Sequence, residues 1–369
     1  MIQAIQIDNE LRGIVEAVKH CAENGQRILP IGNKTKPHLA SVIRDDVQRF
    51  SMSSWSGVIE YQPFEFTVTA KSGTRISELK RLLEAEGQFL PFDPLFVRGG
   101  ATLGGTIATG VSGPGRLLFG GLRDFVLGVQ FIDGLGRLVR GGGKVVKNAA
   151  GFDLPKLMVG SLGRLGVLTE ITMKVFPAPT GYRTLKLNCS SLQVALNHIS
   201  SLMLLPIDIV AIELDGESNL YLRIAGNEAT TATLSKRIRE HLGLSEGEEW
   251  LGEEEMQWWS EAAELSWSEG MRYLVRVPLT LRDVEKLDRR LKRIGAVRRY
   301  SAAVNAVWIA LDSPLAWEEL PYLLREAKLW GVVVRGEGNI IIGSYDALSF
   351  AHRVQRAIDP QNVFVPYQE

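Results

Sequence analysis

The chain has 369 residues, with 42 basic and 42 acidic side chains and therefore no formal net charge. This length allows two domains with substantial cores, and the charge balance gives no general electrostatic reason to expect a nucleic acid or an anionic membrane as partner. Neither Cys21 nor Cys189 lies in a metal-binding or disulfide spacing, and no apolar run reaches the roughly 18 residues that span a membrane. We therefore expect a cytoplasmic protein without direct membrane insertion, which a partner subunit would still allow to associate with a membrane.

The first 177 residues are predicted to alternate helices and strands. Apolar residues at helical spacing follow a cap at Asp8, whereas Phe64, Phe66 and Val68 alternate with polar residues as in a half-buried strand. The expected elements are a helix over 9–24, a strand ending at Ile31, a strand over 64–71, a helix from Ile76 to just before Gly87, a hairpin of residues 125–132 and 137–140, and a strand over 165–176.

After Pro177, where we place a domain boundary, the pattern changes. The expected elements are strand 184–188, helix 191–204, strands 208–214 and 219–224 and helix 228–242, then strand 272–277, helix 281–294, strand 304–311, helix 315–329 and strand 331–335. This order predicts an antiparallel sheet covered by helices on one face. Within residues 245–269, four of the eight tryptophans lie among glutamates, which indicates either an amphipathic helix packed on this sheet or a partner-binding surface.

The most informative stretch is the glycine-rich segment 98–115. Its seven glycines alternate with small residues such as Thr102, Thr106 and Ser112. Glycine lets a backbone approach a ligand closely, and successive N–H groups in such a loop form a concavity that binds anions. The segment therefore predicts a wall against a large, phosphate-bearing cofactor. Neither a Rossmann fingerprint nor a Walker A loop accompanies it.

Two further segments support this interpretation. Residues 27–36 run from a short apolar strand into a turn of small and polar residues, where backbone amides, the Thr35 hydroxyl and a lysine would wrap a pyrophosphate. Residues 147–170 join a small-residue loop to a long alternating strand. A glycine-rich loop alone is weak evidence, but the three segments together favour a nucleotide cofactor.

Three phrases carry a resemblance to a known family. They are GGATLGGTIATGVSGP (99–114), LRDFVLGVQFIDGLG (122–136) and KNAAGFDLPKLMVGSLGRLGVLTEITMKVFP (147–177). They resemble the flavoproteins typified by vanillyl-alcohol oxidase and p-cresol methylhydroxylase, and within them the FAD-binding subunits of glycolate oxidase. The resemblance implies an α+β fold, with an FAD-binding domain of two α+β subdomains over 1–177, an α+β antiparallel-sheet cap over 178–345, and a segment over 346–369 that returns to the FAD-binding domain.

The resemblance also implies which residues bind FAD. Residues 30–35 would form the pyrophosphate loop, 102–106 would run along the pyrophosphate and flavin, and 160–167 would meet the adenine end. The full set of candidates is Pro30, Ile31, Gly32, Asn33, Lys34, Thr35, Gly100, Thr102, Leu103, Gly104, Gly105, Thr106, Thr109, Ser112, Gly113, Lys147, Asn148, Gly151, Gly160, Ser161, Gly166 and Val167.

The pyrophosphate loop departs from the family at one position. Asn33 stands where the family usually has a second glycine, and asparagine tolerates a left-handed backbone better than most residues, so we expect the turn to be retained. Some relatives attach the flavin covalently to a histidine or cysteine. Here the loop has no histidine, His38 lies beyond it at an expected helix start, and neither cysteine lies in a matching motif, so we expect non-covalent FAD.

The sequence gives fewer signals for the residues that bind the substrate than for those that bind FAD. Catalytic relatives carry cap histidines in phrases such as HxGxGN, whereas residues 334–339 keep the glycines of that phrase without its leading histidine. None of the five histidines is paired at ligand spacing, so we expect no metal. Arg335 is a candidate for binding a substrate carboxylate, against the alternative of a structural or surface ion pair. His352 is expected on a helix surface rather than as a base.

The resemblance implies the FAD-binding subunit of a glycolate or other 2-hydroxy-acid dehydrogenase or oxidase. Its expected partners are a small 2-hydroxy acid, a second flavin subunit and an iron–sulfur subunit. Two alternatives stay open: a non-catalytic electron-relay or structural flavin subunit, and an oxidase of another hydroxy compound such as a sugar or lactone.

Overall fold

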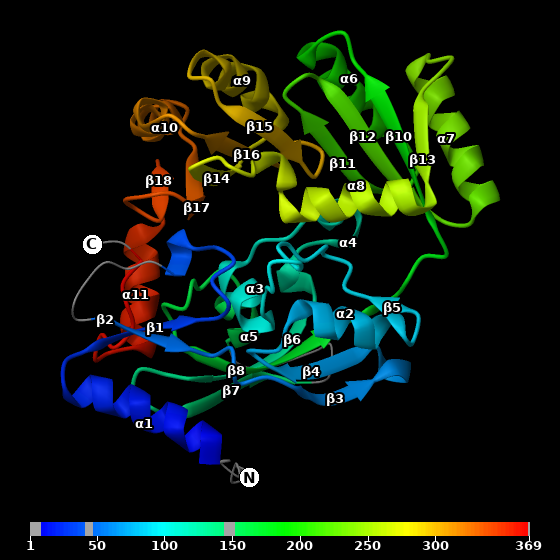
Figure 1. Ribbon diagram of the computed structural model, residues 1–369. Helices are drawn as coiled ribbons and strands as arrows, with labels where there is room; N and C mark the ends of the chain where they lie inside the picture. Colours follow the sequence, from blue (N-terminus) through cyan, green and yellow to red (C-terminus); the bar gives the residue numbers. More distant parts are fainter. Residues whose placement is uncertain (1–8, 41–46, 144–151, 368–369) are drawn as a thin grey trace.

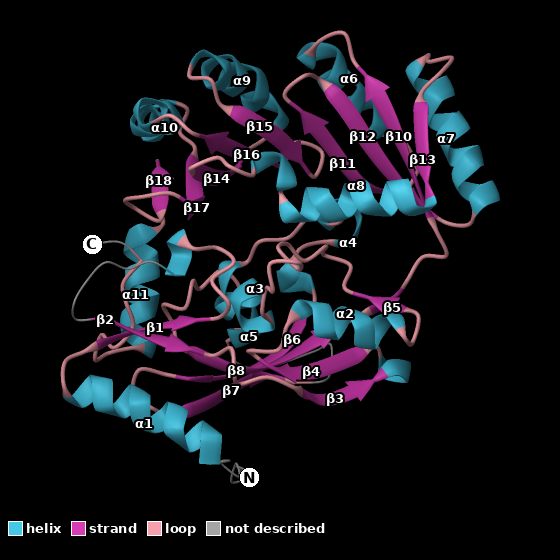
Figure 2. Cartoon of the chain, viewed as in Figure 1, coloured by secondary structure: helices cyan, strands magenta, loops and turns pink. Residues whose placement is uncertain are grey.

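The computed structural model describes residues 9–40, 47–143 and 152–367, which form two parts, each built around a large β-sheet (Figure 1). One sheet has five strands in the order β3-β4-β8-β6-β7, and the other has nine in the order β13-β10-β12-β11-β15-β16-β14-β17-β18. Every pairing within these two sheets is antiparallel. Figure 2 shows that helices accompany both sheets, so the predicted α+β class is confirmed.

The five-stranded part contains the residues up to Pro177. Its elements are α1 (Asn9–Glu23), β1 (Arg27–Ile31), β2 (Val47–Ser51), β3 (Val58–Gln62), β4 (Thr67–Lys71), α2 (Ile76–Glu84), β5 (Gln88–Phe89), α3 (Leu103–Thr109), α4 (Arg116–Phe119), β6 (Val126–Ile132), β7 (Leu138–Gly142), α5 (Leu154–Met158), β8 (Val167–Lys174) and β9 (Phe176–Pro177). The helix expected over 9–24 and the hairpin of β6 and β7 are confirmed.

The strand expected over 64–71 begins later than the alternation of apolar and polar residues predicted. Residues Pro63–Glu65 form a short 3-10 turn, Phe66 has a φ of +53°, and β4 starts at Thr67. Proline has a fixed φ and no N–H to donate, so it favours this turn over a continuous strand. Phe64 is consequently 98% exposed, and only the residues from Thr67 onward pair with β8.

The nine-stranded part follows in the chain. Its elements are β10 (Tyr182–Asn188), α6 (Leu192–Leu202), β11 (Ile209–Asp215), β12 (Asn219–Ala225), α7 (Glu228–Leu242), β13 (Glu248–Leu251), α8 (Gly252–Glu264), β14 (Tyr273–Pro278), α9 (Val284–Arg293), β15 (Val297–Ser301), β16 (Ala306–Leu311), α10 (Pro314–Glu326), β17 (Trp330–Arg335) and β18 (Ile341–Gly343). Three of these strands, β13, β15 and β18, were missed by the sequence analysis, and the strand expected from residue 304 begins at Ala306.

The expectation that helices cover only one face of this sheet is wrong. Helices α6, α7, α9 and α10 bury their apolar residues on one face, whereas α8 lies on the other face, toward the five-stranded part (Figure 1). Strands β11 and β12 are buried along most of their length, because both faces are covered. Of the two alternatives for the tryptophans around α8, the structure shows the helix packed on the sheet. Trp250 and Trp259 are buried, and the Trp259 Nε1 donates a hydrogen bond to the Thr184 hydroxyl at 2.7 Å.

After the nine-stranded sheet, the chain returns to the first part through α11 (Leu348–Ile358) (Figure 1). The fully buried Asp359 then accepts hydrogen bonds from the backbone N–H groups of Val363, at 3.0 Å, and Phe364, at 2.7 Å. Phe364 forms a parallel bridge with Ile28, whose N–H donates to the Val363 carbonyl at 2.7 Å. The turn at Asp359 therefore brings the end of the described chain beside β1.

This arrangement predicts that Asp359→Ala destabilises the protein strongly. The substitution leaves two buried N–H groups without an acceptor, which costs about 2 to 5 kcal/mol of unfolding free energy. Asp359→Asn keeps one acceptor oxygen and should cost less. Urea unfolding followed by tryptophan fluorescence measures both, and equal midpoints for Asp359→Ala and the wild type would contradict the role assigned to this turn.

Candidate functional site

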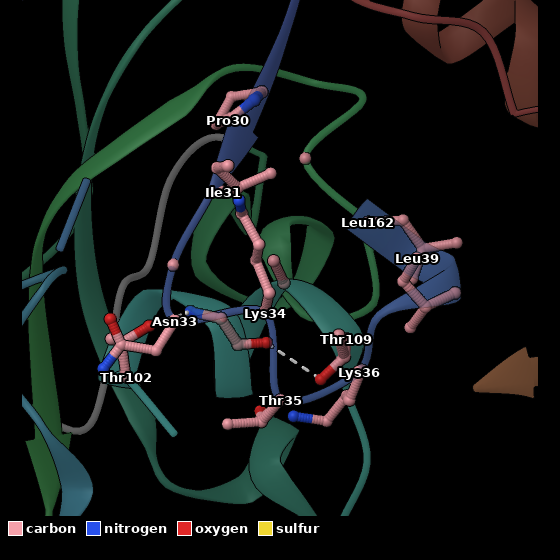
Figure 3. A pocket seen from close by; sticks show the side chains of 14 residues that line it. Pro30, Ile31, Asn33, Lys34, Thr35, Lys36, Leu39, Thr102, Thr109 and Leu162 are labelled. Carbon is pink, nitrogen blue, oxygen red and sulfur yellow. Dashed lines mark hydrogen bonds between the residues drawn. The ribbon is translucent and has the colours of Figure 1, made fainter. Parts of the chain in front are cut away.

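A pocket lies where the turn after β1 meets helix α3, and Figure 3 shows the side chains gathered around it. The lining residues come from three segments that are far apart in the sequence. They are Pro30, Ile31, Gly32, Asn33, Lys34, Thr35, Lys36, Leu39, Thr102, Gly105, Ala108, Thr109, Leu162 and Gly163. We call this the loop pocket. It brings together nine of the predicted residues: the six from Pro30 to Thr35, with Thr102, Gly105 and Thr109.

The loop and the helix approach so closely that glycine is required at position 32. A Cβ on Gly32 would collide with the Thr102 hydroxyl, which already accepts a hydrogen bond from the Gly105 N–H at 3.2 Å. Asn33 adds a second contact between the loop and the segment before α3, because its Nδ2 donates a hydrogen bond to the Gly100 carbonyl at 2.7 Å. The left-handed residue of the turn is Lys34, with a φ of +56°, rather than Asn33 as expected. Asn33 thus serves the turn through its side chain.

A second cavity adjoins the loop pocket and continues along the same wall. It is lined in part by Gly32, Ser72, Gly104 and Gly166. Gly104 donates its N–H to the Ser72 carbonyl at 2.7 Å, and a Cβ on Gly104 would lie 2.8 Å from the Ser72 Cβ. The backbone at Gly104 therefore also leaves no room for a side chain.

Three buried hydroxyls near this wall have no hydrogen-bond partner within the described residues. They belong to Ser72, Thr106 and Ser161. Buried polar groups in folded proteins are usually paired, so orphan hydroxyls of this kind indicate a polar ligand. Together with the glycine cradle, they fit a nucleotide cofactor.

Lys36 gives the loop pocket a buried positive charge. Its side chain is 7% exposed, and its Nζ lies 5.3 Å from the centre of the Phe96 ring. Burial lowers the pKa of Lys36 to about 8, and the more distant charge of Glu264 opposes this shift. No carboxylate of the described chain forms an ion pair with it. An anion in the pocket would stabilise the protonated lysine, which is the behaviour expected of a phosphate-binding group.

The other candidates fall in several places. Ser112 and Gly160 line an adjoining cavity between the two parts of the molecule, which Thr109 also lines. Leu103 and Val167 are buried in the hydrophobic core, and Gly113 packs against the Asp93 backbone. Three candidates lie outside the described residues: Lys147, Asn148 and Gly151.

Arg335 lies away from the loop pocket. Its Nη1 donates to the backbone carbonyls of Ser268, at 2.9 Å, and Met271, at 2.8 Å, so the guanidinium is engaged in holding this segment. His38 follows the loop in a 3-10 turn and hydrogen-bonds the backbone of residues 336–339, and burial lowers its pKa. Cys21 and Cys189 are both free thiols.

Within residues 9–40, 47–143 and 152–367, no cluster of three or more His, Cys, Asp or Glu side chains is placed to hold a metal ion. In the same residues, no helix combines the length and apolarity needed to cross a membrane.

Sequence reasoning missed several residues of these cavities. Lys36 was noted only as part of its segment, because a lysine beside a polar turn is ordinarily exposed. Ser72 directly follows a predicted strand, and Leu162 and Gly163 lie between two predicted candidates. These three residues could therefore have been identified only from their positions in the sequence. Arg276 of β14 and Arg116 of α4, which line the cavity between the two parts, gave no sequence signal at all.

Comparisons with known proteins agree with this geometry. Residues 10–142 match the model of a family described as an FAD binding domain. The chain is 37% identical to the glycolate oxidase subunit GlcE of Escherichia coli over 253 residues, which cover 69% of this chain and 68% of that protein. It is 30% identical to the glycolate oxidase subunit GlcD of Bacillus subtilis over 183 residues, or 50% of this chain and 39% of that one.

More distant relatives share part of the chain or the fold alone. A D-lactate dehydrogenase of Anaerostipes hadrus is 32% identical over 166 residues, which cover 45% of this chain and only 34% of that protein. Among solved structures, an alkyldihydroxyacetonephosphate synthase superposes with a TM-score of 0.70 over 97% of this chain and 74% of that one, at 14% identity. This last similarity concerns the fold.

The contact at Gly32 predicts that Gly32→Ala weakens FAD binding. The new methyl group would rotate Thr102, remove its hydrogen bond to Gly105 and narrow the loop pocket; overpacking of this size costs about 1 to 3 kcal/mol, or about tenfold or more in affinity. Flavin absorbance per protein after dialysis measures the effect. Gly13→Ala in α1, where a Cβ meets nothing within 4 Å, is the matched control and should keep its full flavin content.

The buried Lys36 predicts that FAD affinity depends on pH. Below its pKa of about 8 the lysine is charged before binding, whereas above it a proton must be taken up when the pyrophosphate enters. The dissociation constant should therefore rise by up to about tenfold per pH unit above pH 8. Titration of apoprotein with FAD from pH 7 to 9.5, followed by flavin fluorescence, tests this. Lys36→Met should bind weakly with a flat profile, and an unchanged slope in that variant would assign the dependence to another group.

Proposed function

Because the chain belongs to the FAD-binding family that contains the glycolate oxidase subunit GlcE, we propose that it acts as a flavin-binding subunit in the oxidation of a small 2-hydroxy acid. The observation that carries this proposal is the loop pocket, where Gly32 and Thr102 meet beside the buried Lys36. The 2-hydroxy acid is supported by the names of the relatives: glycolate oxidase subunits, D-lactate dehydrogenases and D-2-hydroxyglutarate dehydrogenases.

In this proposal the chain's own residues bind and orient the cofactor. The amides of residues 31–35, with Lys36, hold the pyrophosphate, and residues 102–106 run beside it. The hydroxyls of Ser72, Thr106 and Ser161 are available to the polar edge of the ligand. FAD, when bound, would supply the acceptor for the hydride, which carries two electrons away from the hydroxylated carbon. We propose that the FAD-binding domain comprises residues 1–177 and 346–369, with 178–345 as the cap.

We propose that FAD is held without a covalent bond. The lining of the loop pocket includes no histidine or cysteine within the described residues, Cys189 lines a different cavity, and the His38 ring faces the turn at 336–339. Acid precipitation should leave a colourless protein pellet and release all the flavin into the supernatant. Yellow colour that stays in the pellet would contradict this.

The relatives' names also indicate a complex of several subunits. We propose that this chain works with a second flavin subunit and an iron–sulfur subunit, and that any association with a membrane runs through them. Among the described residues there is no cysteine cluster to hold iron and sulfur, so electrons would leave through another chain or a diffusible acceptor.

The proposed activity predicts that the bound flavin bleaches on addition of one 2-hydroxy acid without oxygen. Glycolate, D-lactate and L-lactate are added in turn to the purified chain and to the chain with its partner subunits. Bleaching of the isolated chain makes it catalytic and names the substrate. Flavin that bleaches only in the complex favours an electron-relay subunit, and flavin that stays oxidised in both would contradict the proposed function.

A further inference from the structure

A cavity of about 420 Å³ lies between the two parts of the molecule. Its lining combines residues of the five-stranded part and of the nine-stranded sheet, and it shares Thr109 and Leu162 with the loop pocket. The two cavities therefore adjoin each other. Its walls include three aromatic side chains, Trp330, Tyr345 and Tyr367.

Two arginines from different parts of the molecule line this cavity. Arg116 comes from α4, in the five-stranded part, and Arg276 from β14, in the nine-stranded sheet. Neither forms an ion pair with a carboxylate of the described chain. Burial, and to a smaller extent the charge of Arg116, lower the pKa of Arg276 to about 10. Both guanidiniums line the same cavity, so their positive charges repel each other.

The cavity offers little negative charge of its own. Its only acidic lining residue in the described chain is Asp124, whose carboxylate accepts the Gly121 N–H at 2.8 Å, and Arg123 adds a further cation at the rim. Two guanidiniums in a cavity with a single carboxylate that pairs with neither of them are unfavourable, and an anion that enters between them relieves the repulsion. A carboxylate suits this place because guanidinium binds it through two parallel hydrogen bonds.

We propose that Arg276 and Arg116 bind the carboxylate of the substrate, and that this anion links the two parts of the molecule across the cavity. The assignment rests on the proposed function for the identity of the substrate, and it replaces Arg335 as the carboxylate-binding residue. Arg335 is already held by the carbonyls of Ser268 and Met271, whereas the Arg276 side chain has no hydrogen-bond partner among the residues that the structure describes.

The test uses oxalate, a small carboxylate that cannot be oxidised as a 2-hydroxy acid, titrated into the flavin-loaded protein by calorimetry. Arg276→Gln should weaken oxalate binding by about 30-fold or more, as expected when one partner of a charged hydrogen-bonded pair is removed. Arg116→Gln should weaken it by about tenfold, because this side chain is less enclosed. Arg276→Lys, which keeps the charge but loses the paired hydrogen bonds, should fall between Arg276→Gln and the wild type.

Arg272→Gln is the matched control. Arg272 directly precedes β14, is exposed and pairs with Glu337 outside the cavity, so the oxalate affinity of this variant should equal that of the wild type. Flavin content and the circular dichroism spectrum are recorded for every variant. Should Arg276→Gln fail to fold, Arg276→Lys and Arg116→Gln decide the question.

Two outcomes would overturn the inference: equal oxalate affinity in the wild type and the cavity variants, or loss of flavin from Arg276→Gln, which would assign the arginine to the cofactor. Oxalate binding that depends on Arg276, in a protein and complex whose flavin no 2-hydroxy acid bleaches, would support the anion site and overturn the proposed function. Bleaching by glycolate with oxalate binding indifferent to Arg276 would do the reverse.

Discussion

The cofactor wall depends on one close contact, between the backbone at Gly32 and the Thr102 side chain. Because no side chain separates them, the turn after β1 and the start of α3 form one continuous surface. A hydrogen bond holds each side of the contact in place. The Gly104 N–H donates to the Ser72 carbonyl, and the Asn33 Nδ2 donates to the Gly100 carbonyl. The glycines of this region therefore allow three segments that are distant in the sequence to pack closely against each other.

Unpaired positive charges are the second feature of the site. Lys36 lies in the loop pocket, Arg276 in the cavity between the two parts, and the fully buried Arg164 has three guanidinium nitrogens without a hydrogen-bond partner in the described chain. Burial lowers the pKa of each of them. Such groups reduce the stability of the empty protein, since a buried charge is favourable only when it is paired. The same groups make the interior attractive to anions.

Local patterns predicted most helices and strands, because amphipathic spacing and turn residues act within a few positions of each other. The strand at Phe64 was misplaced since a proline turn interrupts the alternation, and Val297–Ser301, rich in arginine, has no strand pattern at all. The loop residues were found through a family resemblance. Arg276 was not, because its place follows from the order of nine strands, which pairing across the whole sheet decides.

The return of the chain at Asp359 also affects when, during synthesis, the protein becomes able to bind its cofactor. Strand β1 carries the cofactor turn, yet its neighbour at Phe364 is made only after the whole nine-stranded sheet has been synthesised. On the ribosome, the turn after Ile31 would emerge early and wait for a segment that leaves the exit tunnel late. Vectorial synthesis thus delays the completed binding wall until the intervening part has had time to fold.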